Sequence, residues 1–315
     1  MMLNRRHIRV KVMQTLYAFK GSESDDFSKD QKFLLFSIDN MYNLYLLLMS
    51  LLIEVQKRAE SDLQKKQKKH LATKEDKDPN RKFVNNQLLK LLKDNFSLKE
   101  QLEANKITNW ELDGEYIDII FKDIISSDLY KEYMKTRVSD FKEDKDFIVD
   151  VFKDIMAPND KLYDYMEDKN LTWLDDLPTV NTTILKLLRK VKESSTEHYF
   201  TPKLYKDVED QQFAIDLFKK TLLNNATIKA EIGKRTKNWD SDRIATVDYV
   251  LLQMAICELN NFPSIPVKVT INEYLEISKE YSTPKSSIFI NGILDKLVKE
   301  YEAAGELNKI GRGLM

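Results

Sequence analysis

Apolar and polar residues follow one another along this chain with the spacing of α-helices. In residues 3–20 the apolar positions recur every three or four residues and form one narrow stripe. The stripe consists of Ile8, Val12, Leu16 and Phe19. A second helical tract is predicted from about 31 to 70, apolar on nearly every face at first and strongly charged later. Residues 72–82 have almost no apolar content, so a mobile loop is predicted there.

Prolines divide the final third of the chain into three predicted helices. The first is capped by Asp240 or Ser241 and has apolar residues at helical spacing within 244–255. The second runs from about 268 to 281, and the segment STPKSS caps the third. The residues of the third helix that we expect to face the core are Ile288, Phe289, Ile293, Leu294 and Leu297. Gly292 in this helix costs about 1 kcal/mol relative to Ala, which predicts a close contact with another helix.

Two segments indicate an internal duplication. Residues 146–159 resemble residues 211–225 at an offset of 66. The matched pairs include Phe147 and Phe213, Phe152 and Phe218, Trp173 and Trp239, and Asp176 and Asp242. Unrelated amphipathic helices converge easily on a Phe–Lys pattern, but matched tryptophans are harder to explain in that way. A partial internal repeat is therefore predicted.

The composition favours an all-α fold. With seven Gly and seven Pro in 315 residues, the chain has few residues for the turns of a β or α/β protein. Its 42% hydrophobic and 32% charged residues provide a sizeable core and exclude a disordered chain. The length indicates about two domains.

The compartment is predicted to be the cytoplasm. The single cysteine, Cys257, excludes an internal disulfide and fits a reducing environment. The N-terminus lacks the apolar core of a secretory signal, and the absence of Ser from 3–20 argues against an organelle transit peptide. The apolar run 33–53 is interrupted by Asp39 and Asn40, and its continuous part is about half of the roughly 20 residues that a membrane span needs. We therefore predict a helix buried in a bundle and no membrane partner.

The chain shows no pattern of catalytic or metal-binding residues. His7, His70 and His198 are scattered, and neither a metal-ligand spacing nor a Gly-rich phosphate loop occurs. Cys257 lies in the apolar run LLQMAICEL, which is typical of a small buried residue rather than a nucleophile. We therefore predict a protein that is not an enzyme and that uses no cofactor and no metal.

Positive charge is concentrated in the opening segment. Residues 3–20 hold five Lys or Arg, one His and no acid, whereas the whole chain has 50 basic and 51 acidic residues. Either a solvated helix face or a site for a polyanion explains this excess. Arg6, Arg9 and Tyr17 lie beside the apolar stripe, where arginines can neutralise phosphates and a tyrosine can stack on an unpaired base. Tyr17 fits a core position equally well. The basic excess from 57 to 82 is interpreted as a solvated helix end.

Three segments resemble the NusB family. RRHIRVKVMQTLYAF resembles the arginine-rich first helix of that family, with its Gln-x-Leu-Tyr. NWDSDRIATVDYVLLQMAICEL and PVKVTINEYLEISKEYSTPKSSIFINGILDKL resemble its Trp–Asp–Arg–Ile helix and its closing Phe-x-Asn-Gly-x-Leu-Asp region. The resemblance covers about residues 3–20 and 205–300, just over a third of the chain.

The resemblance implies an all-α fold with a NusB-like core of two helical bundles. An additional helical lobe is then inserted after the first helix, at residues 25–204, and contains the partial repeat. Residues 1–24 supply the first helix of the core, 205–301 supply the remainder, and 302–315 form a C-terminal tail.

The resemblance also implies RNA binding and transcription antitermination. Members of the family act with NusE, a small-subunit ribosomal protein, on the boxA element of nascent ribosomal RNA transcripts, and so reach other Nus factors and RNA polymerase indirectly. The RNA-binding positions carried over to this chain are Arg5, Arg6, Arg9, Tyr17, Lys285 and Phe289. Asp248 takes an acidic position at the edge of the RNA and partner surface.

Several residues depart from the family pattern. Gln253 stands where Arg is usual, Cys257 where Tyr is frequent, and His7 interrupts the arginine run. The insertion could extend the RNA surface, recruit another protein or cover the partner site. A helical protein–protein scaffold that has lost RNA binding is therefore the alternative function. A methyltransferase that carries a NusB-like domain is not expected, because a Gly-rich cofactor loop and a Pro-Cys nucleophile are missing.

Overall fold

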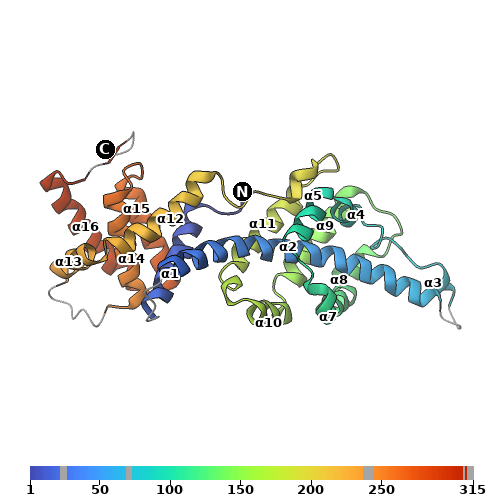
Figure 1. Ribbon diagram of the computed structural model, residues 1–315. Helices are drawn as coiled ribbons and strands as arrows, with labels where there is room; N and C mark the ends of the chain where they lie inside the picture. Colours follow the sequence, from blue (N-terminus) through green and yellow to red (C-terminus); the bar gives the residue numbers. More distant parts are fainter. Residues whose placement is uncertain (22–26, 69–72, 237–243, 308, 311–315) are drawn as a thin grey trace. The chain divides into compact units, whose positions relative to one another are not determined.

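A computed structural model describes residues 1–21, 27–68, 73–236, 244–307 and 309–310 (Figure 1). All regular elements within these ranges are helices, and no strand occurs among them. The prediction of an all-α fold is therefore confirmed. The helices belong to two compact units, which we describe separately. Unit 1 consists mainly of residues 3–38 and 205–315, and unit 2 of residues 39–204.

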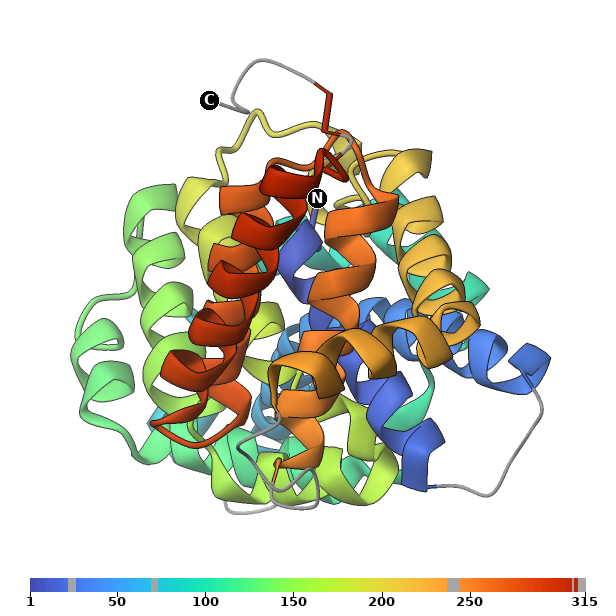
Figure 2. The same cartoon turned by 90° about the vertical axis from the view of Figure 1, so that its left-hand side faces the viewer.

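Unit 1 is built around one buried helix, α14 (Thr246–Asn261). Its helices are α1 (Arg5–Gly21), the start of α2 (Phe27–Gln67), α12 (Val208–Leu223), α13 (Asn225–Arg235), α14 (Thr246–Asn261), α15 (Val267–Tyr281) and α16 (Ser286–Ala304). Every residue of α14 from Val250 to Leu259 is buried, including Cys257, as the sequence predicted. The helix α1 packs against α12, α14 and α15, and Figure 2 shows it in blue behind the orange and red helices. The first three residues of α1 are half-buried, its middle is buried, and its C-terminal end from Tyr17 on is largely exposed.

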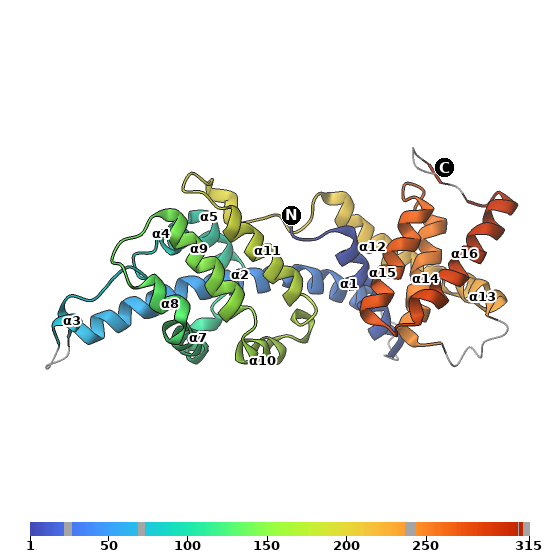
Figure 3. The same ribbon diagram turned by 180° about the vertical axis from the view of Figure 1, so that it is seen from behind.

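Unit 2 surrounds the remainder of α2. Its other helices are α3 (Lys74–Lys77), α4 (Gln87–Asp94), α5 (Phe96–Ala104), α6 (Asn109–Leu112), α7 (Gly114–Ser126), α8 (Asp128–Tyr133), α9 (Phe141–Val151), α10 (Asp160–Lys169) and α11 (Leu177–Lys190) (Figure 3). Two indole N–H groups fix the packing on α2, because Trp110 donates to the Leu47 carbonyl and Trp173 to the Asn40 carbonyl. The helix α2 belongs to both units, so the predicted insertion boundary at residue 25 remains a prediction.

The long apolar helix α2 lies in the protein interior. By length and composition it is the one described helix that could cross a membrane, and 78% of its most apolar window is buried inside the protein. A core helix of this kind passes the same test of length and hydropathy as a membrane span. The burial agrees with the prediction that the run 33–53 forms a bundle helix.

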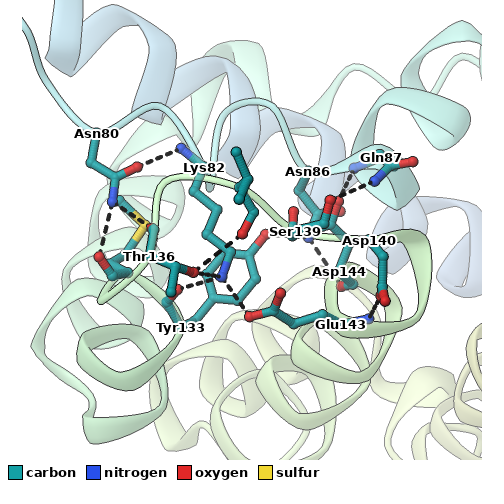
Figure 4. Close-up of polar contacts among 12 residues, drawn as sticks. Asn80, Lys82, Asn86, Gln87, Tyr133, Thr136, Ser139, Asp140, Glu143 and Asp144 are labelled. Carbon is teal, nitrogen blue, oxygen red and sulfur yellow. Dashed lines mark hydrogen bonds and ion pairs between the residues drawn. The ribbon is translucent and has the colours of Figure 1, made fainter.

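The prediction of a mobile loop over residues 72–82 is wrong for the part that the structure describes. The helix α3 lies within it, and Thr73 and Asp76 cap its start reciprocally. Lys82 is buried, and its ammonium group donates to the Tyr133 carbonyl at 2.8 Å and to the Thr136 hydroxyl at 2.7 Å (Figure 4). The same ammonium group pairs with Glu143. The prediction relied on the low apolar content of residues 72–82 alone. It missed the burial of Lys82, because the groups that accept hydrogen bonds from Lys82 lie more than 50 residues away in the chain.

A second group of contacts in Figure 4 surrounds a buried carboxylate. The Tyr133 hydroxyl donates to Asp144, which is fully buried and also accepts from the backbone N–H of Gln87 at 2.7 Å. The Asn86 side chain donates to the Asp144 carbonyl at 3.0 Å and caps α4. Each polar group that this cluster buries has a partner, as buried polar groups require. We therefore assign it a structural role in joining α4, α8 and α9.

The final helix agrees with its prediction except in its first turns. Ile293, Leu294 and Leu297 are buried, as predicted. Ile288 is 75% exposed, so the expectation that it faces the core is wrong, and Phe289 is half-buried. Ser286 and Ile290 are buried there instead. A Cβ atom added to Gly292 would meet nothing within 4 Å, so the predicted close helix contact is absent there. The predicted caps Asp240 and Ser241 lie outside the described residues, and α14 begins at Thr246.

Both segments of the predicted repeat are helical. The side chains of the paired phenylalanines are buried in both: Phe147, Phe152, Phe213 and Phe218. A π-helical turn occupies 152–156 in the first segment, whereas α12 continues as an α-helix over the corresponding residues. Trp239 and Asp242 lie outside the described residues, so the duplication remains a prediction.

Candidate nucleic-acid interface

Each arginine of α1 pairs with a carboxylate from a different helix of unit 1. Arg5 donates through Nε to Asp210 of α12 at 3.0 Å. Arg6 forms two hydrogen bonds of 2.9 Å with Glu273 of α15. Arg9 forms two hydrogen bonds of 2.8 Å with Glu258 of α14. The opening helix contains no acid, but three other helices supply one carboxylate to each arginine.

Arg9 is a buried residue with a structural role. Its side chain is 2% exposed, and Glu258 is fully buried. Glu258 also accepts hydrogen bonds from the hydroxyl groups of Thr270 at 2.8 Å and Tyr274 at 3.1 Å. Burial by itself would lower the pKa of Arg9, but the bonds and charge of Glu258 raise that pKa above its ordinary value. Its low exposure does not favour the predicted contact with a phosphate.

Arg5 and Arg6 line an open groove at the N-terminal end of α1. Both side chains are 40% exposed. The groove has a volume of about 550 Å³, and its other lining residues are Asn4, Arg9, Ser264, Ile265, Pro266, Val269 and Glu273. The hydrogen bond from Arg6 lowers the pKa of Glu273, so this carboxylate is ionised near neutral pH. Arg5 uses one N–H group and Arg6 two, which leaves further donors on both guanidinium groups.

The other predicted residues gather at the opposite end of unit 1. Arg9 meets Glu258 and Lys20 meets Tyr249, so α1 and α14 run antiparallel. The C-terminal end of α1 therefore lies beside the start of α14. Tyr17, at this end, is about 18 Å along the helix axis from Arg5. Tyr17 is 48% exposed there.

Asp248 connects the start of α14 to the segment between α15 and α16. It is buried and accepts hydrogen bonds from the hydroxyl groups of Ser282 at 2.6 Å and Ser286 at 2.7 Å. These bonds hold the turn that presents Lys285, which is exposed, and Phe289, which is half-buried. Asp248 is therefore a positioning residue in this geometry rather than part of the exposed surface.

Sequence comparisons place the chain among known proteins. The sequence model of the NusB family matches residues 180–299. The Transcription antitermination protein NusB of Salinibacter ruber is 42% identical over 112 residues, which are 36% of this chain and 70% of that relative. The chain belongs to the NusB family.

Further NusB proteins match over similar lengths. The relative from Chloroherpeton thalassium is 40% identical over 109 residues, which are 35% of this chain and 52% of that relative. The relative from Koribacter versatilis is 41% identical over 100 residues, 31% of this chain and 68% of that relative. A solved NusB structure from T. maritima is 28% identical, with a TM-score of 0.29 over 36% of this chain and 82% of that chain.

The NusB family match begins within α11 and ends within α16, so it contains α12, α13, α14 and α15 completely. It therefore contains Asp210, Glu258 and Glu273, the three partners of the α1 arginines, none of which the sequence prediction singled out. The signal for Glu258 is an acid within the apolar run LLQMAICEL, followed by one more leucine. An ionised residue in such a run requires a cation from another helix.

Proposed function

We propose that this NusB-family chain is an RNA-binding transcription antitermination factor. It acts with NusE on boxA-like single-stranded RNA in nascent ribosomal RNA transcripts, in the cytoplasm, and it is not an enzyme. Contact with other Nus factors and RNA polymerase is indirect, through the RNA and NusE. The names of the three relatives support antitermination. The observation that carries RNA binding is the exposure of Tyr17 and Lys285 at one end of unit 1, with Phe289 half-exposed beside them.

The exposed groups have complementary roles in this proposal. Lys285 contacts a phosphate, while Tyr17 and Phe289 stack on unpaired bases. Arg5 and Arg6 contact further phosphates with the N–H groups that Asp210 and Glu273 leave free. Asp248 holds the turn that presents Lys285, and Arg9 is left out of the RNA contacts because it is buried.

Lys285→Glu tests this site directly. The substitution removes a charge-assisted contact from an exposed position, so RNA affinity should fall by about 1–3 kcal/mol with no loss of thermal stability. Binding is measured on boxA-like and scrambled strands across a salt series, with and without purified NusE. Lys299→Glu on α16 makes the same change of charge at another exposed lysine and is the matched control. Native affinity of Lys285→Glu at low salt would exclude this turn from the RNA site.

A helical protein–protein scaffold is the second candidate. The pairing of all three α1 arginines with carboxylates favours it, because the excess charge of the opening helix is compensated within unit 1. This function requires that purified protein binds NusE or another protein but neither RNA strand at low salt. Selective binding of the boxA-like strand would exclude it.

A further inference from the structure

A pocket in unit 2 is lined by three segments that lie far apart in the chain. It has a volume of about 450 Å³, and sites for small ligands usually measure about 300–1,000 Å³. The helix α2 supplies Asp39 and Tyr42, and α5 supplies Gln101 together with its C-cap Asn105. Residues 201–204, which follow α11 in the chain, complete the wall. All of these residues belong to unit 2, so the pocket is distinct from the candidate interface of unit 1.

Hydrogen bonds to one turn hold the three segments together. The buried Tyr45 hydroxyl on α2 donates to the Phe200 carbonyl at 2.7 Å. The Asn95 side chain, at the start of α5, donates to the Glu197 carbonyl at 2.9 Å. Glu197 and Phe200 are the two ends of one short helical turn, and the pocket residues 201–204 follow it directly. The walls of the pocket are therefore fixed by the fold of unit 2.

Tyr42 provides an aromatic ring in the pocket wall. It is half-buried and stacks on the buried Tyr45, with ring centres 5.8 Å apart and an angle of 20° between the rings. Aromatic side chains in such positions stack on unpaired bases of single strands, whatever the base. Burial raises the pKa of Tyr42 to about 12, so its hydroxyl is protonated at neutral pH and can donate a hydrogen bond.

The other polar groups of the pocket match the remaining parts of a nucleotide. Asn105 donates through Nδ2 to the Gln101 backbone carbonyl at 2.8 Å, which uses one of its two N–H donors. The carboxamides of these two residues lie one helical turn apart and offer both donors and acceptors to the edge of a base. Lys203 is exposed and can contact a phosphate. Asp39 can accept a hydrogen bond from a ribose hydroxyl, and partial burial raises the pKa of this carboxyl group because water solvates its charge incompletely.

We propose that this pocket, which we call the Tyr42 pocket, binds one nucleotide of a single-stranded RNA. The base stacks on Tyr42 and meets the carboxamides of Gln101 and Asn105. Its phosphate pairs with Lys203, and its ribose donates a hydrogen bond to Asp39. The inference rests on the proposed RNA-binding function and adds residues of unit 2 to it. These contacts supplement those of unit 1, so their loss weakens binding of the strand without abolishing it.

Two variants of the full chain test the Tyr42 pocket through different physical effects. Lys203→Met removes a charge, so a boxA-like strand with single-stranded flanks should bind about tenfold more weakly at low salt. The slope of log affinity against log salt should also fall by about 0.7. Gln101→Leu removes hydrogen bonds to the base but no charge, so affinity should fall several-fold with an unchanged slope.

Matched controls make the same chemical changes outside the pocket. Lys206→Met alters another exposed lysine, three residues along the chain from Lys203. Gln64→Leu alters an exposed glutamine on α2, about 33 Å along the helix axis from Tyr42. Both controls should bind the strand as the unaltered chain does. Melting temperatures are measured for every variant, and if one pocket variant is destabilised the other decides.

A free nucleotide presents the same groups as a nucleotide of a strand, so each variant is also titrated with the ribonucleoside monophosphates of adenine, guanine, cytosine and uracil. Weaker strand binding in the pocket variants, with the controls unchanged, supports a nucleotide of the strand as the ligand. Unchanged strand binding together with weaker mononucleotide binding supports a free nucleotide. If the pocket variants keep both affinities, the Tyr42 pocket is overturned while RNA binding stands. If the unaltered chain binds neither RNA strand, the proposed function fails, and the mononucleotide titration alone decides for or against the pocket.

Discussion

The three arginines of α1 share one segment but not one environment. Arg9 is enclosed with Glu258 in the interior, whereas Arg5 and Arg6 remain 40% exposed at the rim of a groove. A buried pair is costly to break, because the remaining charge cannot return to water. An exposed pair contributes little, because water and salt screen it. Arg9 therefore maintains the fold, and Arg5 and Arg6 are free to contribute to binding.

Arg9→Ala should destabilise unit 1 strongly. The substitution leaves the buried Glu258 side chain without its cationic partner, which costs about 3–5 kcal/mol. Arg5→Ala removes a partly exposed pair and should cost about 1 kcal/mol or less. The free energy of unfolding from urea titration measures both. Equal costs for the two variants would contradict the assignment of Arg9 as structural.

At the scale of one element, the first turns of α16 show how a tertiary contact affects which residues are buried. Its sequence offers several apolar residues there, including Ile288, Phe289 and Ile290. Ser286 is buried and its hydroxyl donates to Asp248 of α14. The buried positions continue from Ser286 through Ile290 and Leu294 at helical spacing, which leaves Ile288 exposed. The hydrogen bond to α14 thus accompanies the one wrong core position, while the rest of the predicted face is buried.

Gly292→Ala should raise the stability of unit 1 by about 1 kcal/mol. The residue is exposed in the interior of α16, and a Cβ atom would meet nothing within 4 Å. The gain comes from the lower backbone entropy of the unfolded chain. Thermal or urea unfolding measures it, with Lys296→Ala on the same helix as a control for surface substitution. A loss of stability would indicate a contact at Gly292 that the isolated chain does not show.

At the scale of the whole molecule, unit 2 is proposed to be an accessory lobe of a NusB-like core. The three arginine pairs lie within unit 1. Replacing residues 39–204 with a flexible Gly/Ser linker should therefore leave a helical protein that still binds the boxA-like strand. Circular dichroism and the same RNA titrations measure this. Loss of cooperative unfolding in the shortened chain would show that unit 2 completes the core.

The sequence by itself determined the helical character of the chain, the burial of Cys257 and the resemblance to the NusB family. These features depend on spacing within short segments, because helix hydrogen bonds and amphipathic faces repeat every three or four residues. The second and third helices of the final third were placed to within a few residues on this basis. The exposed positions of Tyr17 and Lys285 also agree with their predicted availability to RNA, although their contacts remain a proposal.

Only the tertiary structure decided which charged side chains are paired within the fold and which can contact a ligand. Arg9 and Glu258 are 249 residues apart in the chain, and Lys82 and Glu143 are 61 apart. Charge compensation acts through space, so no local window of sequence shows that three other helices supply the carboxylates for the arginines of an acid-free helix.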